Sequence, residues 1–217
     1  TNNVFPVMVE ATMAGAAAGL VAAGAVDVSR VSLPAKVVRV EIDGEADDLA
    51  PVDAGFLIND RVGNFMPIDP SRIRRIVLAR AEPASVGTSP IGGMLCPAGA
   101  ADDFGVCVTC VDHADGGQVL LAPISPGLYR NVHVNDASRL PLGERVSVRG
   151  PGILSFDGDR ERTLQANQQA RLRVERDGPR VIDVDAALSQ AAAAGAFLGR
   201  SGWRDAFDGA WSDSGCC

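Results

Sequence analysis

The chain has 217 residues, a formal net charge of −7 and a pI near 4.8. Hydrophobic residues make up 47% of it and charged residues 22%, a balance that excludes a disordered chain and is sufficient for one sizeable core. The acidic charge argues against nucleic-acid partners and against binding to an anionic membrane surface. A small metabolite is the kind of ligand that this composition favours.

The chain opens with a polar loop that leads into an Ala-rich segment. Thr1, Asn2 and Asn3 precede this segment, which predicts a helix over 6–23 that is closed by Gly24. Free backbone N–H groups at the start of a helix bind phosphate, so the three polar residues are candidates for phosphate contacts. Ordinary helix capping also explains them.

Short apolar runs separated by Gly, Pro, Asp and Asn clusters predict strands along most of the remaining chain. About ten such runs are found, at 36–42, 55–58, 74–79, 105–111, 118–122, 132–135, 145–149, 152–156, 171–175 and 180–184. Alternation in the first run gives one buried face, which is typical of antiparallel sheets. We therefore expect an α+β fold: a sandwich-type or barrel-type core of mostly antiparallel strands, flanked by Ala-rich helices at 7–23 and 185–198 that lie together against one side of the core.

Neither a membrane segment nor a metal site is expected. The apolar run at 11–26 follows Glu10 and is too short to span a bilayer, so it predicts a packed helix. The five cysteines lack disulfide-like spacing, which favours a reducing cytoplasm. Cys107, Cys110 and His113 have partial zinc spacing, but a strand would direct the two cysteines to opposite faces.

Four blocks of sequence carry a resemblance to a known family. They are N-N-V-F-P at 2–6, A-E-P-A-S-V-G-T-S-P-I-G-G at 81–93, L-A-P-I-S-P-G-L at 121–128 and F-D-G-D-R-E at 156–161. In this order they resemble the C-terminal half of the ATP-NAD kinase family, especially its acetoin-catabolism protein X branch, over about residues 1–198. The acidic turn in the last block is also similar to a turn of diacylglycerol and other lipid kinases.

The resemblance implies a two-domain kinase whose active site lies between an N-terminal α/β domain and a NAD kinase-like β-rich domain. Residues 1–34 would end the α/β domain, 35–198 would form the β-rich domain with its closing helix, and 199–217 would be a tail. The sequence contains no Gly-Gly-Asp-Gly motif, so we expect most of the α/β domain to be missing and the chain not to phosphorylate NAD by itself. The resemblance further implies ATP and Mg²⁺ as cofactors, an NAD-like acceptor and a cytoplasmic homo-oligomer.

Candidate site residues come from these blocks. Asp157 and Asp159 are the candidates for catalysis, because a carboxylate can hold Mg²⁺ or accept a proton, although an Asp-Gly hairpin turn needs no function. The candidates for nucleotide or phosphate contacts are Thr1, Asn2, Asn3, Asp53, Ser85, Gly87, Thr88 and Ser89. By the resemblance Asp53 would contact a ribose, whereas a solvated loop acid is the alternative. If these residues form one site, segments far apart in the sequence must converge.

Two classes of function remain open at this stage. The first is the C-terminal part of a small-molecule kinase that transfers phosphate to NAD or a related metabolite, with a lipid-kinase-like phosphotransferase as a variant. The second is a non-catalytic β domain that serves oligomerisation or ligand sensing. The sequence upstream of Thr1 would distinguish these two classes.

Overall fold

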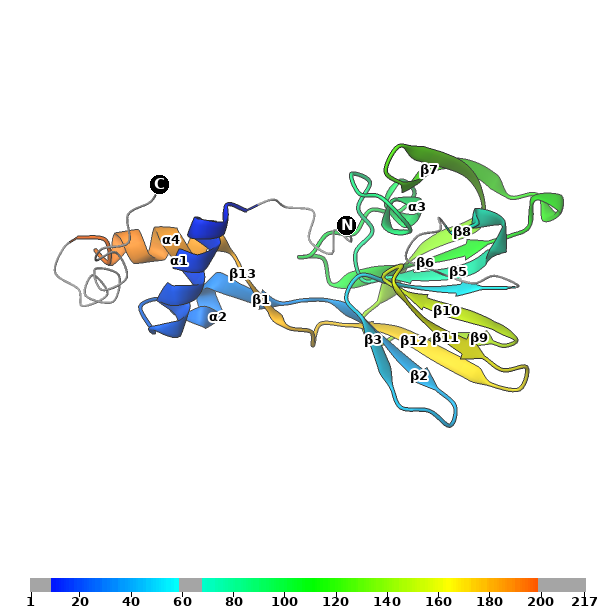
Figure 1. Ribbon diagram of the computed structural model, residues 1–217, viewed down its shortest axis with the longest axis horizontal. Coiled ribbons are helices and arrows are strands. Elements are labelled where there is room, and N and C mark those ends of the chain that lie inside the picture. Colours follow the sequence, from blue (N-terminus) through cyan, green and yellow to red (C-terminus); the bar gives the residue numbers. More distant parts are fainter. Residues whose placement is uncertain (1–8, 59–67, 199–217) are drawn as a thin grey trace, which may run out of the picture. The chain divides into compact units, whose positions relative to one another are not determined.

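The computed structural model describes residues 9–58 and 68–198, which form two compact units (Figure 1). Residues 34–179 make up a β-rich unit, and the segments on either side of it, up to Leu33 and from Arg180, make up a helical unit. No helix within the described ranges is both long and apolar enough to cross a membrane.

Two antiparallel sheets form the β-rich unit. In spatial order, the larger sheet contains β11 (Arg160–Leu164), β10 (Gly152–Phe156), β4 (Asp53–Leu57), β5 (Ile73–Leu78), β6 (Phe104–Cys110), β8 (Leu128–Pro141) and β7 (Gln118–Ser125). The smaller sheet contains β3 (Asp48–Ala50), β2 (Val37–Ile42), β12 (Gln169–Glu175) and β9 (Val146–Arg149). Neighbouring strands in both sheets run antiparallel. The mainly antiparallel α+β fold that the sequence predicts is therefore confirmed.

The central strands β4, β5 and β6 of the larger sheet are buried on both faces, whereas its edge strand β11 is mostly exposed. The inner face of the larger sheet packs on the smaller sheet, where Phe56, Val77 and Phe156 meet Leu172 and Val174. The opposite face forms a second apolar cluster with a short helix and the loop that follows it. Burial on both faces explains why all five residues of β4 are buried rather than every other one.

Three short helical elements connect the strands of this unit. They are η1 (Pro70–Arg72), α3 (Ser89–Gly93) and η2 (His113–Asp115). Helix α3 is fully buried and contacts β6 and β7. A Cβ atom at Gly92 would lie 2.2 Å from Leu78 Cδ1, and one at Gly93 would lie 2.6 Å from the backbone of Glu82. The Gly-Gly pair therefore permits a close approach of α3 to β5 and to the segment after it.

The helical unit joins both ends of the described chain. It contains α1 (Ala11–Ala22), α2 (Val28–Val31) and α4 (Val184–Ala193), together with a two-stranded sheet of β1 (Ser32–Pro34) and β13 (Arg180–Ile182). Small side chains such as Ala17, Ala187 and Ala191 are completely buried between its helices, so α1 and α4 pack together as predicted. Gly24 has a φ of +68°, the left-handed conformation expected of a glycine that closes a helix.

The ten predicted strands all overlap an observed strand. The sequence did not indicate β1, β3 or β11, nor the short helices α2 and α3. Cys107 and Cys110 contribute to the apolar clusters on opposite faces of the larger sheet, as their positions in a strand predict. The predicted domain limits at residues 34 and 198 stay predictions.

Candidate functional site

Asp53 begins β4, and the neighbouring strands bring two separate loops to it. The pairing of β4 with β10 places the turn that follows Phe156 beside Asp53. On its other edge β4 pairs with β5, where Asp53 lies opposite Leu78. The chain leaving β5 forms the loop that contains Thr88, whose side chain hydrogen-bonds the Asp53 carboxyl. Three segments distant in sequence therefore meet at Asp53.

The acidic turn holds the start of β4 through its own side chain. Asp157 and Gly158 have φ values of +52° and +75°, and two consecutive positive values are what a type I′ hairpin turn requires. Asp157 Oδ1 accepts hydrogen bonds from the backbone N–H groups of Val52 at 2.7 Å and Asp53 at 3.3 Å. The Asp157 N–H donates to the Asp53 carbonyl at 3.1 Å. Asp157 thus has a positioning role for Asp53.

The serines of the 82–88 loop and of α3 bond within the fold. The Ser85 hydroxyl donates to the Glu82 carbonyl at 2.7 Å. The Ser89 hydroxyl donates to the Arg80 carbonyl and accepts from the Glu82 N–H, both at 3.0 Å. These hydrogen bonds bridge the two ends of the loop and orient the residues between them.

Gly87 and Thr88 complete this loop. Gly87 has a φ of +106°, and its N–H donates to the Pro123 carbonyl on β7 at 2.9 Å. Thr88 is buried, and its side chain is the one that reaches Asp53. The left-handed backbone at Gly87 turns the chain toward the acidic cluster, a conformation that other residues adopt only at a cost.

Burial determines the electrostatics of the cluster. Asp53 is 8% exposed, and burial raises its pKa to about 7, with further upward contributions from the charges of Asp157 and Asp159 and an opposing one from the Thr88 hydrogen bond. Burial also raises the pKa of Asp157, while its backbone hydrogen bonds and the charge of Arg160 act in the opposite direction. Asp53 is therefore close to half ionised at neutral pH.

Arg160 balances part of this negative charge. Its guanidinium lies 3.8 Å from Asp157 Oδ2 and 2.9 Å from Asp48 Oδ1. It also lies over the Phe156 ring, 5.3 Å from the ring centroid. Arg160 is not among the site residues predicted from the sequence, although an arginine close after an acidic turn is a usable signal for an ion pair.

The structure brings together only part of the predicted set. Asp53, Thr88 and Asp157 form one cluster, and Asp159 lies in the exposed part of the same turn, near enough for its charge to act on Asp53. The adjoining segment contains Ser85, Gly87 and Ser89, which form hydrogen bonds with backbone carbonyl groups of the fold. Thr1, Asn2 and Asn3 lie outside the described residues.

The cluster suits a ligand that carries hydroxyl groups. A carboxyl with a pKa near 7 can accept a proton or bond a hydroxyl, whereas a phosphate at the same position would meet nearby carboxylates. Asp157 Oδ1 is bonded to two N–H groups. No group of three or more His, Cys, Asp or Glu side chains that could hold a metal by themselves occurs in the described ranges.

The β-rich unit that carries this acidic cluster is an α+β domain made mainly of strands, and it belongs to a known family. The family model for the acetoin catabolism protein X C-terminal domain matches residues 36–177, and the chain belongs to that family. Over 196 residues it is also 31% identical to the acetoin catabolism protein X of Cupriavidus necator. The matched region covers 88% of this chain and 55% of that protein, so the chain spans about half the length of this curated relative.

Proposed function

We propose that this domain supplies the acceptor side of an NAD kinase-like phosphotransfer site, with Asp53 and Thr88 binding hydroxyl groups of an NAD-like metabolite. The observation that carries the proposal is the convergence of Asp53, Thr88 and the turn at Asp157 from three separate segments. The resemblance of the same segments to ATP-NAD kinases, and the membership of the acetoin catabolism protein X family, support it.

In this proposal each residue of the cluster has one task. Asp53, with a pKa near 7, accepts a hydrogen bond or a proton from a hydroxyl of the acceptor. Thr88 orients the Asp53 carboxyl, and Asp157 fixes the backbone from which Asp53 projects. The resemblance implies ATP and Mg²⁺ as cofactors. Other groups would hold the phosphates of ATP, since the cluster is negative, whereas a carboxylate such as that of Asp159 would suit Mg²⁺.

Binding of NAD to the purified 217-residue chain tests the proposal by isothermal titration calorimetry. We expect saturable binding, weakened at least about tenfold, or about 1.4 kcal/mol, by Asp53→Asn or by Thr88→Val. Asp136→Asn, which changes an exposed acid on β8, is the matched control and should bind as the unaltered chain does. Absence of binding, or equal affinity in all variants, would contradict the proposal.

Turnover distinguishes a kinase from a ligand-sensing domain. In an intact family member that carries a Gly-Gly-Asp-Gly loop, we expect Asp159→Asn to lower NADP formation, because it removes a carboxylate suited to holding Mg²⁺ or accepting a proton. Folding should change little, since Asn is also tolerated in turns. NAD binding without any phosphorylated product would favour the sensing function. Phosphorylation of a lipid alcohol in place of NAD would favour the lipid-kinase-like variant.

A further inference from the structure

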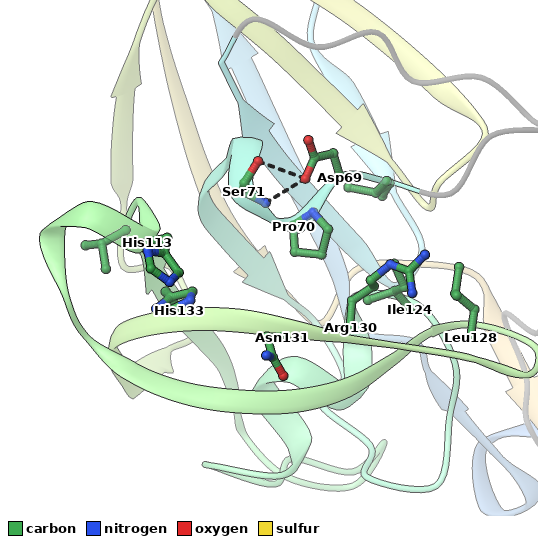
Figure 2. A pocket seen from close by; sticks show the side chains of 11 residues that line it. Asp69, Pro70, Ser71, His113, Ile124, Leu128, Arg130, Asn131 and His133 are labelled. Atoms are coloured by element: carbon green, nitrogen blue, oxygen red, sulfur yellow. Dashed lines mark hydrogen bonds between the residues drawn. The ribbon is translucent and has the colours of Figure 1, made fainter.

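A pocket of about 580 Å³ lies at the other end of β5 from the Asp53 cluster (Figure 2). Asp53 pairs with Leu78 at the end of β5, whereas one wall of the pocket comes from η1, which precedes Ile73. The length of β5 separates the two by about 16 Å, at about 3.3 Å per residue. The volume falls within the range of about 300 to 1,000 Å³ that small-molecule sites occupy.

Apolar side chains form much of this pocket. Ile68 and Pro70 line it from the η1 side, and Ile124 and Leu128 line it from the hairpin of β7 and β8. Asp69 also lines the pocket, but its Oδ1 accepts hydrogen bonds from the Ser71 N–H and hydroxyl at 3.0 and 2.8 Å. Asp69 Oδ2 also lies 3.6 Å from Arg72 Nε, so an arginine of η1 balances its charge. The remaining wall favours a ligand that carries an apolar chain.

The polar groups that remain include two imidazoles and a guanidinium. The chain has two histidines, His113 and His133, and both line this pocket, with ring centroids 4.8 Å apart. His133 Nδ1 lies 3.1 Å from the Gly116 carbonyl, which only accepts, so Nδ1 carries the proton in this contact. Figure 2 shows the two imidazoles together on one side and Arg130 on the other, with Ile124 and Leu128.

Arg130 is the cationic group of the pocket. Its Nη1 donates to the Tyr129 carbonyl at 3.3 Å, a single contact for a guanidinium that has five N–H donors. Arg130 forms no ion pair with any other residue in 9–58 or 68–198. An available guanidinium beside an apolar wall, in a chain of net charge −7, is suited to a carboxylate, which it can bind through two parallel hydrogen bonds.

We propose that this pocket binds a short-chain carboxylic acid. The carboxylate pairs with Arg130, and the carbon chain lies along Ile124, Leu128 and Pro70. Inorganic phosphate would use the guanidinium but not the apolar wall, and an uncharged alcohol would use the wall but not the guanidinium. The pocket should distinguish the acid from both, independently of any ligand at Asp53.

The two histidines give this proposal a direct readout, because their ring protons can be followed by NMR in the intact chain at constant pH. Titration with hexanoate should shift both His113 and His133 signals along one saturable curve. Hexan-1-ol and inorganic phosphate should each need at least about tenfold higher concentration for half of the effect. No shift with hexanoate, or equal affinity for either comparison compound, would overturn the proposal.

Variants of Arg130 assign the carboxylate contact. Arg130→Gln should raise the hexanoate dissociation constant at least fivefold while leaving the weak hexan-1-ol response unchanged, and Arg130→Lys should give an intermediate value because the charge is retained without the fork geometry. Arg149→Gln, at an exposed position on β9, is the matched control. Unchanged hexanoate affinity in a folded Arg130→Gln chain, with its unfolding midpoint preserved, would refute the assignment.

Discussion

Asp53 is an acid in a strand that is otherwise apolar and buried. The following residues of β4, among them Ala54, Phe56 and Leu57, belong to the two apolar clusters of the β-rich unit. Removing a carboxylate from water costs free energy, which is why burial raises the pKa of Asp53 to about 7. A carboxyl group that is buried at a cost in free energy is more readily explained by a functional role than by a stabilising one.

The raised pKa predicts how stability depends on pH. The folded chain holds the Asp53 proton up to about pH 7, whereas the unfolded chain releases it near pH 3.8, so the folded state binds more protons in between. Stability must therefore fall as the pH rises through this window, by about 4 kcal/mol for this group. The Asp53→Asn chain should lack that loss. Its free energy of unfolding in urea, measured from pH 4 to pH 8, should therefore rise relative to that of the unaltered chain.

The comparison with Asp136→Asn separates this effect from the titration of other groups. Asp136 is an exposed acid on β8, and its substitution removes one carboxylate away from the Asp53 cluster. If the difference in unfolding free energy between the Asp53→Asn chain and the unaltered chain stayed constant with pH, the raised pKa could not be assigned to Asp53.

Individual site residues could be predicted from the sequence only where the chemical type of the side chain indicates a function. Asp157 stands out as an acid directly after a predicted strand, and Asp53 is indicated by the family resemblance; the structure brings them together. Ser85 and Ser89 have the same polar character as Thr88 but bond to nearby backbone. Which hydroxyl turns toward Asp53 depends on the loop conformation, and a local pattern does not specify that.

At the scale of elements, strands with a hydrophobic pattern were predictable and short or charged ones were not. β11 reads R-E-R-T-L and has four exposed residues, because it is the edge of the larger sheet and its position comes from pairing with β10. β3 has three residues and is defined by its pairing with β2. Both strands are placed by pairing with the preceding strand across a short turn, and their own residues carry no alternating hydrophobic pattern that would display this.

Helix α3 escaped prediction for a related reason. Its sequence, S-P-I-G-G, contains two glycines, which disfavour an isolated helix. In the fold those glycines let α3 lie against β5 and against the segment that carries Glu82 and Pro83. Packing thus outweighs propensity here, and α3 in turn fixes the end of the loop that presents Thr88.

Gly93→Ala tests this role of α3. A Cβ atom at Gly93 would lie 2.6 Å from the backbone of both Glu82 and Pro83, so either α3 or the loop must move. Overpacking of this kind costs about 1–3 kcal/mol. We expect that loss of unfolding free energy in urea, together with a higher Asp53 pKa measured by NMR, since the Thr88 hydrogen bond that lowers this pKa would weaken.

Gly99→Ala is the control for Gly93→Ala. The nearest atom to a Cβ at Gly99 would be Asp102 Oδ2 at 3.6 Å, an ordinary contact, so this variant should change neither stability nor the Asp53 pKa appreciably. A Gly93→Ala chain as stable as the Gly99→Ala chain would show that α3 adjusts without moving the loop.

The hairpin of β7 and β8 contributes to both candidate sites. Pro123 accepts the hydrogen bond from Gly87, next to the residue that contacts Asp53. The adjacent Ile124 lines the pocket that contains Arg130. The two sites therefore have a common element although they lie at different ends of β5.

At the scale of the whole chain, the structural and family boundaries nearly coincide. The β-rich unit spans 34–179, and the match to the acetoin catabolism protein X C-terminal domain spans 36–177. The two ends of this unit are adjacent, since Ala35 donates its N–H to the Pro179 carbonyl at 2.9 Å and Gly178 donates to the Ala35 carbonyl at 3.0 Å. Adjacent ends and an internal core are properties of a domain that folds by itself.

Residues 34–179 should therefore fold without the helical unit. The two apolar clusters of the β-rich unit draw their members from within these limits, and so do Asp53, Thr88 and Asp157. We expect the fragment to unfold cooperatively in urea, to keep the strand-rich circular dichroism of the intact chain, and to retain the raised Asp53 pKa.

A shorter fragment, 52–179, is the control: it lacks β2 and β3, which supply Val38, Val40 and Ala50 to the core between the sheets. Loss of two of the four strands of the smaller sheet uncovers part of one face of the larger sheet, so the shorter fragment should not unfold cooperatively. If the 34–179 fragment failed to unfold cooperatively, the β-rich unit would not be the independent domain that its boundaries indicate.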